Sequence, residues 1–271
     1  MIRQATQTTR AYGAMAAMMP KLFLAYQFQI WFNVAMEIIS LVITVAFWRA
    51  VFAGRATVGG LMAAQTLNYV MLARIFHDGA YATSMLREFG GMMREGGIQI
   101  ALLRPLDFQA SLYVQKLALL GLNVVMRFPL AFVAWLLFGL QLPADPVVWV
   151  AAAVSLLLGC TVMFGFDWIL ACAAFYTTDA WGLATARQGL VLFFSGMLLP
   201  LAIMPEWLRT IASILPFSQA VYLPVSILSG LTPLAELPRL WLLQLSYLVV
   251  LLVLSRLVFR RAVRVVTVQG G

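Results

Sequence analysis

The side chains of this sequence that could do acid–base, nucleophilic or metal chemistry are few and widely scattered. His77 is the only histidine among the 271 residues, and the two cysteines, Cys160 and Cys172, lie in or near one apolar block. No histidine, cysteine and carboxylate residues have the spacing of metal ligands, so we expect no metal site and two inert, buried thiols. A membrane enzyme needs clustered acids, histidines or a nucleophile near the interface, and the sequence therefore predicts no catalytic residue.

Several charged residues fall inside stretches that are long and apolar enough to lie in a bilayer. A centrally placed arginine costs about 2.5–3.5 kcal/mol on insertion scales, so each one needs a partner or a water-filled cavity. Arg74 and Asp78 are four residues apart and can pair on one helix face. Glu37 and Arg127 lie in two other apolar blocks at depths that could meet. For them we predict an interhelical ion pair, or polar groups that line a substrate path.

One polar segment, residues 87–107, separates two apolar blocks and ends in an apolar stripe edged by charge. The apolar positions are Ile98, Ala101, Leu102 and Pro105, and the charged positions are Arg94, Glu95, Arg104 and Asp107. The spacing of the apolar positions is helical. Two interpretations remain open at this point, namely a surface helix that rests on lipid headgroups and a docking helix for a soluble partner.

Three glycines, Gly182, Gly189 and Gly196, recur at a strict spacing of seven, which predicts one face of a helix. Small residues let helix backbones approach closely where no hydrophobic force drives helices together. The stripe is consistent with packing inside one subunit and equally with the seam between two subunits.

The elements that must hold these residues are membrane helices. Of the 271 residues 63% are hydrophobic and only 10% are charged, and the apolar residues form long blocks between isolated charges. A soluble domain of this length needs more polar surface, and lipid requires each helix to satisfy its own backbone hydrogen bonds. The short alternating segments of an outer-membrane barrel are absent from the sequence. The predicted fold class is therefore all-α and polytopic, in a single transmembrane domain.

About six spanning helices are predicted, at residues 31–52, 56–77, 112–140, 147–171, 183–204 and 240–259. Residues 1–30 are expected to form a cytoplasmic tail and an interfacial helix, and residues 260–271 a second cytoplasmic tail. Residues 205–235 contain an uncharged stretch that is long enough to cross, but prolines and a glycine divide it into short pieces. A re-entrant segment therefore fits this stretch better than a seventh span.

The basic residues support this topology. With six spans both termini lie on one side, and most arginines and both lysines fall on that side, whereas only Arg55, Arg209 and Arg239 fall opposite. Basic residues concentrate on the cytoplasmic side of membrane proteins, so we predict a multi-pass protein of a bacterial inner or plasma membrane with both termini in the cytoplasm. The net charge of +8 sits at the ends of apolar blocks rather than in a water-facing stripe, which disfavours nucleic-acid binding.

Parts of the sequence resemble the permeases of the ABC-2 type export family. The run from Gly97 to Leu106 resembles the family's G-x-x-x-x-L-L-R-P-L element. Residues 194–200, 204–208 and 215–217 resemble its fifth helix and the re-entrant segment that follows, and residues 21–27 resemble its elbow helix.

The resemblance implies a half-transporter. Two permease subunits, identical or paralogous, would pair with two separate ATP-binding subunits, and the polar segment would be the coupling helix that sits in a groove of the ATPase. The sequence itself has no phosphate-binding loop, because its only lysines, Lys21 and Lys116, do not follow a glycine. We therefore expect no cofactor in this chain, and ATP and Mg²⁺ in the partner ATPase.

The main alternative is a secondary transporter driven by an ion gradient. That class usually shows internal repeats and interrupted helices with midplane charges, and no clear repeat is visible in this sequence. The sequence does not identify the substrate.

Overall fold

The computed structural model describes residues 10–18, 27–81, 85–177 and 181–265, which are almost entirely helical. The long helices are α2 (Gln27–Val51), α3 (Ala63–Tyr81), α6 (Phe108–Met126), α7 (Phe128–Phe138), α8 (Pro146–Ala171), α9 (Trp181–Phe194) and α12 (Leu237–Ala262). The shorter helices are α4 (Met85–Arg94), α5 (Gly97–Leu102), α10 (Glu206–Ile214) and α11 (Tyr222–Leu228). Residues 10–18 are also helical, and most of the stretch expected to form the elbow helix, residues 21–26, lies outside the described residues.

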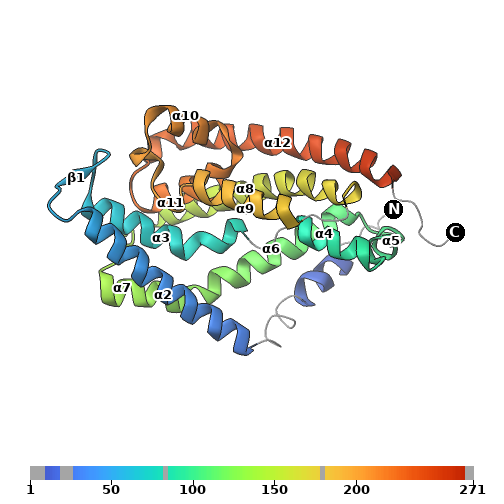
Figure 1. The fold of residues 1–271 in the computed structure, drawn as a ribbon, viewed down its shortest axis with the longest axis horizontal. Helices are drawn as coiled ribbons and strands as arrows, with labels where there is room; N and C mark the ends of the chain where they lie inside the picture. The colour runs from blue at the N-terminus through green and yellow to red at the C-terminus, as the bar shows by residue number, and fades with distance from the viewer. Residues whose placement is uncertain (1–9, 19–26, 82–84, 178–180, 266–271) are drawn as a thin grey trace.

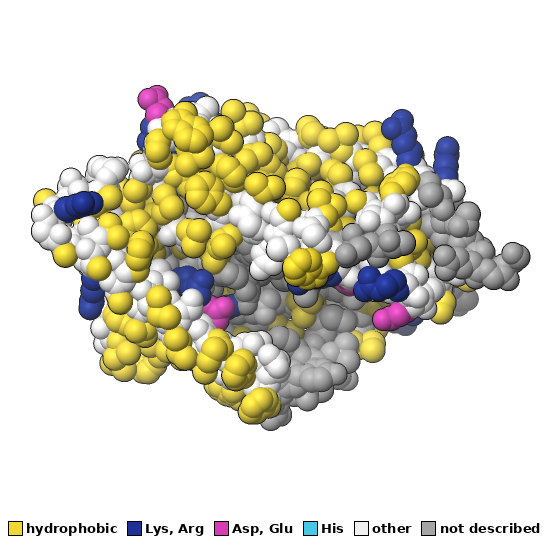
Figure 2. Space-filling model, in the orientation of Figure 1, with side chains coloured by type: hydrophobic (Ala, Val, Ile, Leu, Met, Phe, Trp, Pro, Cys, Tyr) yellow, Lys and Arg dark blue, Asp and Glu magenta, His cyan; other side chains and the backbone are white. Residues whose placement is uncertain are grey.

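The helices lie side by side along the long axis of the molecule (Figure 1). One end carries α4, α5 and the last turns of α12, and the opposite end carries α10 and a hairpin of two short strands, β1 (Thr57–Val58) and β2 (Leu61–Met62). Much of the visible surface is apolar (Figure 2), as expected for helices that face lipid. The prediction of an all-α, polytopic membrane protein is confirmed.

Four helices within the described residues are long and apolar enough to cross a membrane: Phe28–Val51, Phe108–Phe138, Pro146–Phe175 and Leu234–Ala262. A fifth crossing follows if the bent pair Glu206–Ile214 and Pro216–Leu228, which meet at 74°, is counted as one span. The expected count of about six also included α3 and α9. Neither α3, which carries Arg74 and Asp78, nor α9, which has only 14 residues, is among these four helices.

Two predicted spans begin or end elsewhere because of glycine. Residues 57–62 form the hairpin rather than the start of a helix, because consecutive Gly59 and Gly60 both have positive φ angles, 57° and 82°. Helix α9 ends at Phe194 rather than continuing to residue 204, and Gly196, with φ 81°, turns the chain.

The predicted span over residues 112–140 is two helices that meet at Arg127. Pro129 lies in the first turn of α7, where it lacks the N–H that a continuous helix would need. The backbone N–H of Arg127 donates to the carbonyls of Asn123 and Val124 and so closes α6. The break places a charged side chain at the junction of α6 and α7.

The segment from α10 to α11 packs tightly against the long helices α8 and α12. A Cβ added to Gly159 of α8 would lie 2.2 Å from the backbone oxygen of Gln219, so the two backbones are in contact. Gln244 of α12 donates from Nε2 to the carbonyls of Ser155 and Gln219, at 3.0 Å each. A buried polar contact of this kind fixes the segment because the groups have no water to bond instead.

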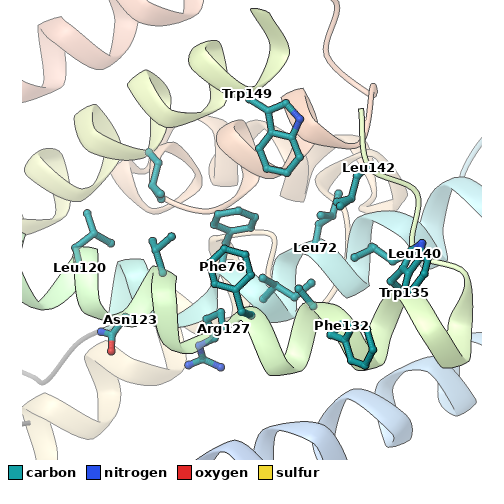
Figure 3. Close-up of a pocket in the computed structure, with 15 residues that line it drawn as sticks. Leu72, Phe76, Leu120, Asn123, Arg127, Phe132, Trp135, Leu140, Leu142 and Trp149 are labelled. Carbon is teal, nitrogen blue, oxygen red and sulfur yellow. The ribbon is translucent and has the colours of Figure 1, made fainter. Parts of the chain in front are cut away.

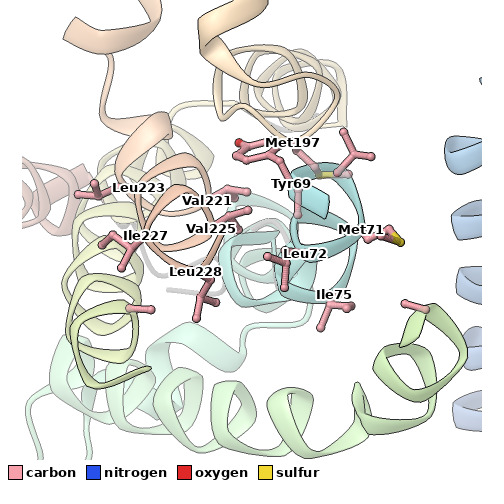
Figure 4. Close-up of a cluster of buried hydrophobic side chains, with 14 of the residues drawn as sticks. Tyr69, Met71, Leu72, Ile75, Met197, Val221, Leu223, Val225, Ile227 and Leu228 are labelled. Carbon is pink, nitrogen blue, oxygen red and sulfur yellow. The ribbon is translucent and has the colours of Figure 1, made fainter. Parts of the chain in front are cut away.

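Two groups of buried apolar side chains form the core. The larger group joins α3 to α11, where Leu72 lies beside Val225 and Leu228, and Tyr69 lies beside Met197 (Figure 4). The second group lies under α4 and α5 at the other end of the molecule and is rich in aromatic residues.

Candidate functional site

The α4–α5 segment, residues 85–107, turns back on itself at Gly96, whose φ of 68° suits a residue without a side chain. Helix α4 buries Met85, Leu86 and Phe89 against the rest of the chain. The other face of the segment is open to solvent. It carries Arg94, Glu95, Ile100, Leu103, Arg104 and Pro105.

The apolar stripe predicted for docking is only partly on this open face. Ile98 is 1% exposed and belongs to the core beneath the segment, so the prediction that it contacts a partner is wrong. Ala101 and Leu102 are half-buried. The apolar side chains that the structure exposes are Ile100, at 63%, and Leu103, at 85%. The helical period of the sequence identified an apolar face but could not show that this face packs inward.

A cluster of aromatic rings lies directly under the α4–α5 segment. The ring of Phe89 is 5.2 Å from that of Trp168 on α8 and 5.6 Å from that of Phe108 on α6. Trp168 in turn lies 5.1 Å from Phe259 on α12. Aromatic pairs at these distances pack closely and contribute about 0.5–1.5 kcal/mol each beyond their burial. The segment is therefore in contact, through these rings, with a cluster that includes side chains of α6, α8 and α12.

Two ion pairs tie the same end together. Lys116 of α6 donates to Glu88 of α4 at 2.9 Å, and Arg256 of α12 donates to Asp107. Asp107 also caps α6, because its Oδ1 accepts from the backbone N–H of Ala110 at 2.7 Å. Burial alone would raise the pKa of Asp107, but the hydrogen bonds from Arg256 and Ala110 outweigh it and hold that pKa below its usual range. Asp107 thus has partners within the subunit.

Three predicted charges meet in a hollow beside α2, and we call Glu37, Arg74 and Arg127 the charge cluster. Arg74 Nη2 donates to Glu37 Oε2 at 3.1 Å and also to Ser40. Arg127 Nη1 lies 3.6 Å from the same Glu37 oxygen. The cluster therefore joins α2, α3 and the α6–α7 junction. The side chain of Asp78, the partner expected for Arg74, lies outside the described residues.

Two cavities adjoin the charge cluster. The first, which we call the aromatic cavity, has a volume of about 340 Å³ and lies between α3, the α6–α7 pair and α8 (Figure 3). Phe76, Phe132, Trp135 and Trp149 are among its lining residues. The second, the polar cavity, has a volume of about 380 Å³ and is lined by Glu37 and Asn33 among others. Asn123 and Arg127 line both cavities.

Comparison with known proteins adds one match. The family model described as "ABC-2 family transporter protein" matches residues 38–270, which is most of the chain. The chain belongs to the ABC-2 transporter family. A search of the curated proteins finds no match.

Membership of the ABC-2 family identifies a multi-pass membrane protein of a transport system and indicates a permease subunit of an ABC transporter. Such permeases associate with ATP-binding subunits and are not themselves the catalytic component. The family assignment agrees with the resemblance found in the sequence, and the run Gly97–Leu106 that carries the resemblance is helix α5 and the turn after it.

The three glycines that were predicted to share one helix face have different surroundings in the structure. Gly182 and Gly189 lie on α9 and are exposed, and a Cβ added to either would meet no atom within 4 Å. Gly196 lies beyond the end of α9 and is buried, and its carbonyl accepts from the Tyr69 hydroxyl at 2.8 Å. The expectation that Gly196 shares a helix face with the other two is therefore wrong.

An ion pair between α8 and α9 was not predicted from the sequence. Arg187 donates from Nε and Nη2 to the two carboxylate oxygens of Asp167, at 2.8 and 2.6 Å. This bidentate geometry is the strongest form of the Arg–carboxylate pair. In the sequence, Asp167 is a lone acid near the inner end of one apolar block, and Arg187 is a lone arginine in the next block. These positions alone do not show that the two helices face each other.

Proposed function

We propose that this chain is the permease subunit of an ATP-driven exporter, and that it works as a homodimer or heterodimer with two separate ATPase subunits. ATP and Mg²⁺ bind in those partner chains. Each ATPase docks on the open face of the α4–α5 segment, and the dimer of permeases forms the path of the cargo. The supporting observation is the exposed pair Ile100 and Leu103, carried on a segment that packs on aromatic rings from three long helices.

The chemistry of this face suits a soluble protein partner. Two large apolar side chains stand between Arg94, Glu95 and Arg104, which resembles the apolar centre and charged rim of a protein interface. A cavity of about 410 Å³ beside α5, lined by Ile100, Ala101 and Arg104 among others, can receive a partner side chain. Closure of the ATPase pair would then press on α5 and, through Phe89 and Trp168, on α6, α8 and α12.

The distribution of arginines supports a cytoplasmic position for this face in a bacterial plasma membrane. Arg94, Arg104, Arg260 and Arg261 lie at the end that carries α5, whereas Arg55, Arg209 and Arg239 lie on elements of the opposite end. Because basic residues concentrate on the cytoplasmic side, both termini and the α4–α5 segment are cytoplasmic in this proposal.

The docking proposal is tested with matched surface variants of the tagged full-length chain, purified from its own membranes. Leu103→Glu and Ile100→Glu place a charge in an apolar contact, so we expect each to lower the copurifying ATP hydrolysis about tenfold. Ile214→Glu is the control, because Ile214 is equally exposed, at 64%, but lies on α10 at the other end.

Two results contradict the proposal. One is ATP hydrolysis that survives Leu103→Glu as well as it survives Ile214→Glu. The other is transport by the purified chain in vesicles without any nucleotide-hydrolysing partner, which is the behaviour of a secondary transporter.

A further inference from the structure

The end of α12 carries a group of arginines on the outside of the molecule. The helix continues into a short 3₁₀ turn, Val263–Val265, and Arg260, Arg261 and Arg264 lie on these last turns. All three side chains are exposed. In Figure 2 basic side chains stand out from the surface where α12 ends. We call these three residues the basic cluster.

The spacing of charges along α12 places the basic cluster at the level of lipid headgroups. No charged residue lies between Arg239 and Arg256. At about 1.5 Å per residue these two positions are about 26 Å apart, which is close to the thickness of a hydrocarbon core, about 30 Å. Arg260 and Arg264 lie about 6 Å and about 12 Å beyond Arg256 on the same scale, where the bilayer carries its phosphate groups.

The basic cluster is not neutralised by the described part of the chain. Asp107 is paired with Arg256, and Asp167 with Arg187. Within the described residues, no carboxylate forms an ion pair with an arginine of the basic cluster. An external anion can therefore bind these arginines without displacing a carboxylate of the protein.

A groove between α6, α8 and α12 begins beside the basic cluster, and we call it the lipid groove. It has a volume of about 300 Å³ and a mainly apolar lining, formed by Gln109, Ala110, Tyr113, Thr161, Phe164, Leu252 and Arg256. Ala110, Tyr113, Thr161 and Leu252 are all half-buried, so the groove opens on the outside of the helices.

The two hydroxyl groups on the wall of the lipid groove bond to each other. The hydroxyl oxygens of Tyr113 and Thr161 lie 2.8 Å apart, and Thr161 donates to the carbonyl of Leu157 at 2.7 Å. The proton of each hydroxyl is therefore already in a hydrogen bond, with Tyr113 as donor to Thr161. A wall of this kind suits a hydrocarbon chain better than a polar ligand.

The lipid groove and the basic cluster follow one another along α12. Leu252 and Arg256 line the groove, and Arg260 lies one turn beyond Arg256. We propose that this surface binds an anionic phospholipid of the bilayer. One acyl chain lies in the lipid groove, and the phosphate accepts hydrogen bonds from Arg260 and Arg264. Basic pockets between spanning helices bind anionic headgroups through such charge-assisted bonds.

The test uses the full-length chain in micelles of an uncharged detergent, with no ATPase present. The probes are dioleoyl phosphatidylglycerol, which is anionic, and dioleoyl phosphatidylcholine, which has the same acyl chains and no net charge. Native mass spectrometry measures the fraction of protein that carries one lipid at each lipid concentration. Two charge-assisted hydrogen bonds should make phosphatidylglycerol half-saturate the protein at a concentration about tenfold lower.

Paired variants of equal net charge distinguish a site from general attraction to a basic protein. Arg260→Gln combined with Arg264→Gln should abolish the preference for phosphatidylglycerol, whereas lysine at both positions should retain most of it, because the charge remains. Arg209→Gln combined with Arg239→Gln is the matched control. It also removes two exposed charges, but at the opposite end of the molecule, and should leave the preference unchanged. Unchanged binding of phosphatidylcholine shows that a variant is folded.

Two further probes test the position of the lipid and the need for its chains. Phosphatidylglycerol with a photoreactive diazirine in one acyl chain should give adducts at residues 110–113 and 161–164, which the glutamine pair at 260 and 264 should lose. Glycerophosphoglycerol, the soluble headgroup without chains, should not displace the lipid at an equal concentration, because it gains nothing from the groove.

Four results would overturn the proposal. They are equal half-saturation by the two lipids, the same loss of preference in both glutamine pairs, adducts that lie outside the groove, and displacement of the lipid by an equal concentration of glycerophosphoglycerol. The assay contains no ATPase and does not depend on the proposed function. Failure here therefore leaves ATPase docking untouched, and failure of docking leaves the lipid site untouched.

Discussion

Glu37 forms ion pairs with two arginines, Arg74 and Arg127, and only the pair with Arg127 was predicted. The cost of an unpaired charge in lipid predicts that Glu37 has a partner, and the estimated depths suggest Arg127. Arg74 was assigned to Asp78 because the two are four residues apart on one helix. The contact of Arg74 with Glu37 and Ser40 depends on how α2 and α3 are rotated against each other, which local spacing does not reveal.

Asp107 has two structural roles that different substitutions of this residue can separate. It caps α6 and pairs with Arg256. Asp107→Ala removes both and should cost about 1 kcal/mol, the usual value of an N-cap. Asp107→Asn keeps a capping oxygen and loses only the exposed ion pair, so its melting temperature should lie between those of the parent and the alanine variant. An asparagine variant as unstable as the alanine variant would contradict the capping role.

The same residue predicts a pH dependence. Because the pKa of Asp107 is lowered in the folded protein, its stabilisation is fully present above the ordinary carboxyl pKa of about 4 and is lost as the pH falls through the lowered value. The difference in melting temperature between the parent and Asp107→Asn should therefore persist at neutral pH and disappear in strong acid. A difference that is constant down to strong acid would contradict the lowered pKa.

At the scale of elements, hydrophobic blocks predicted the long helices well and their ends poorly. Helix α8 was expected at 147–171 and spans Pro146–Ala171, because Asp145 and Pro146 give a clear start. The span predicted over 112–140 is the apolar stretch Phe108–Phe138, and its interruption at Arg127, two residues before Pro129, was not predicted. The hairpin at Gly59–Gly60 and the end of α9 near Gly196 were missed, because apolar content alone does not show where a glycine takes a positive φ.

Helix α9 gives a prediction about assembly. Gly182 and Gly189 lie on its exposed face, and a partner helix could approach there closely. Gly189→Leu should reduce crosslinking between two copies, or between paralogous permeases, in native membranes. Gly121→Leu is the matched control, because Gly121 on α6 is also exposed and a Cβ there meets no atom within 4 Å. Equal crosslinking in both variants would place the seam elsewhere.

At the scale of the whole molecule, composition and charge distribution predicted the membrane class, and the family match confirms it. Within the segment proposed for docking, the apolar face expected to be exposed is partly buried. Ile98 and Ile100 are two residues apart in a short helix, and only the tertiary contacts of Phe89 and Trp168 determine which of them is buried. Sequence pattern alone therefore does not show which apolar side chains of this segment are exposed, because the packing beneath it decides that.

The central claim is that a separate nucleotide-binding chain contacts the open face of the α4–α5 segment, and a crosslinking measurement tests it most directly. Cys160 and Cys172 are replaced by alanine, a photoreactive maleimide is attached at Leu103→Cys or at Ile214→Cys, and native membranes are illuminated with a labelled azido-ATP. We expect a nucleotide-labelled adduct from position 103 and none from position 214. No labelled adduct at position 103, or equal adducts at both positions, would contradict it.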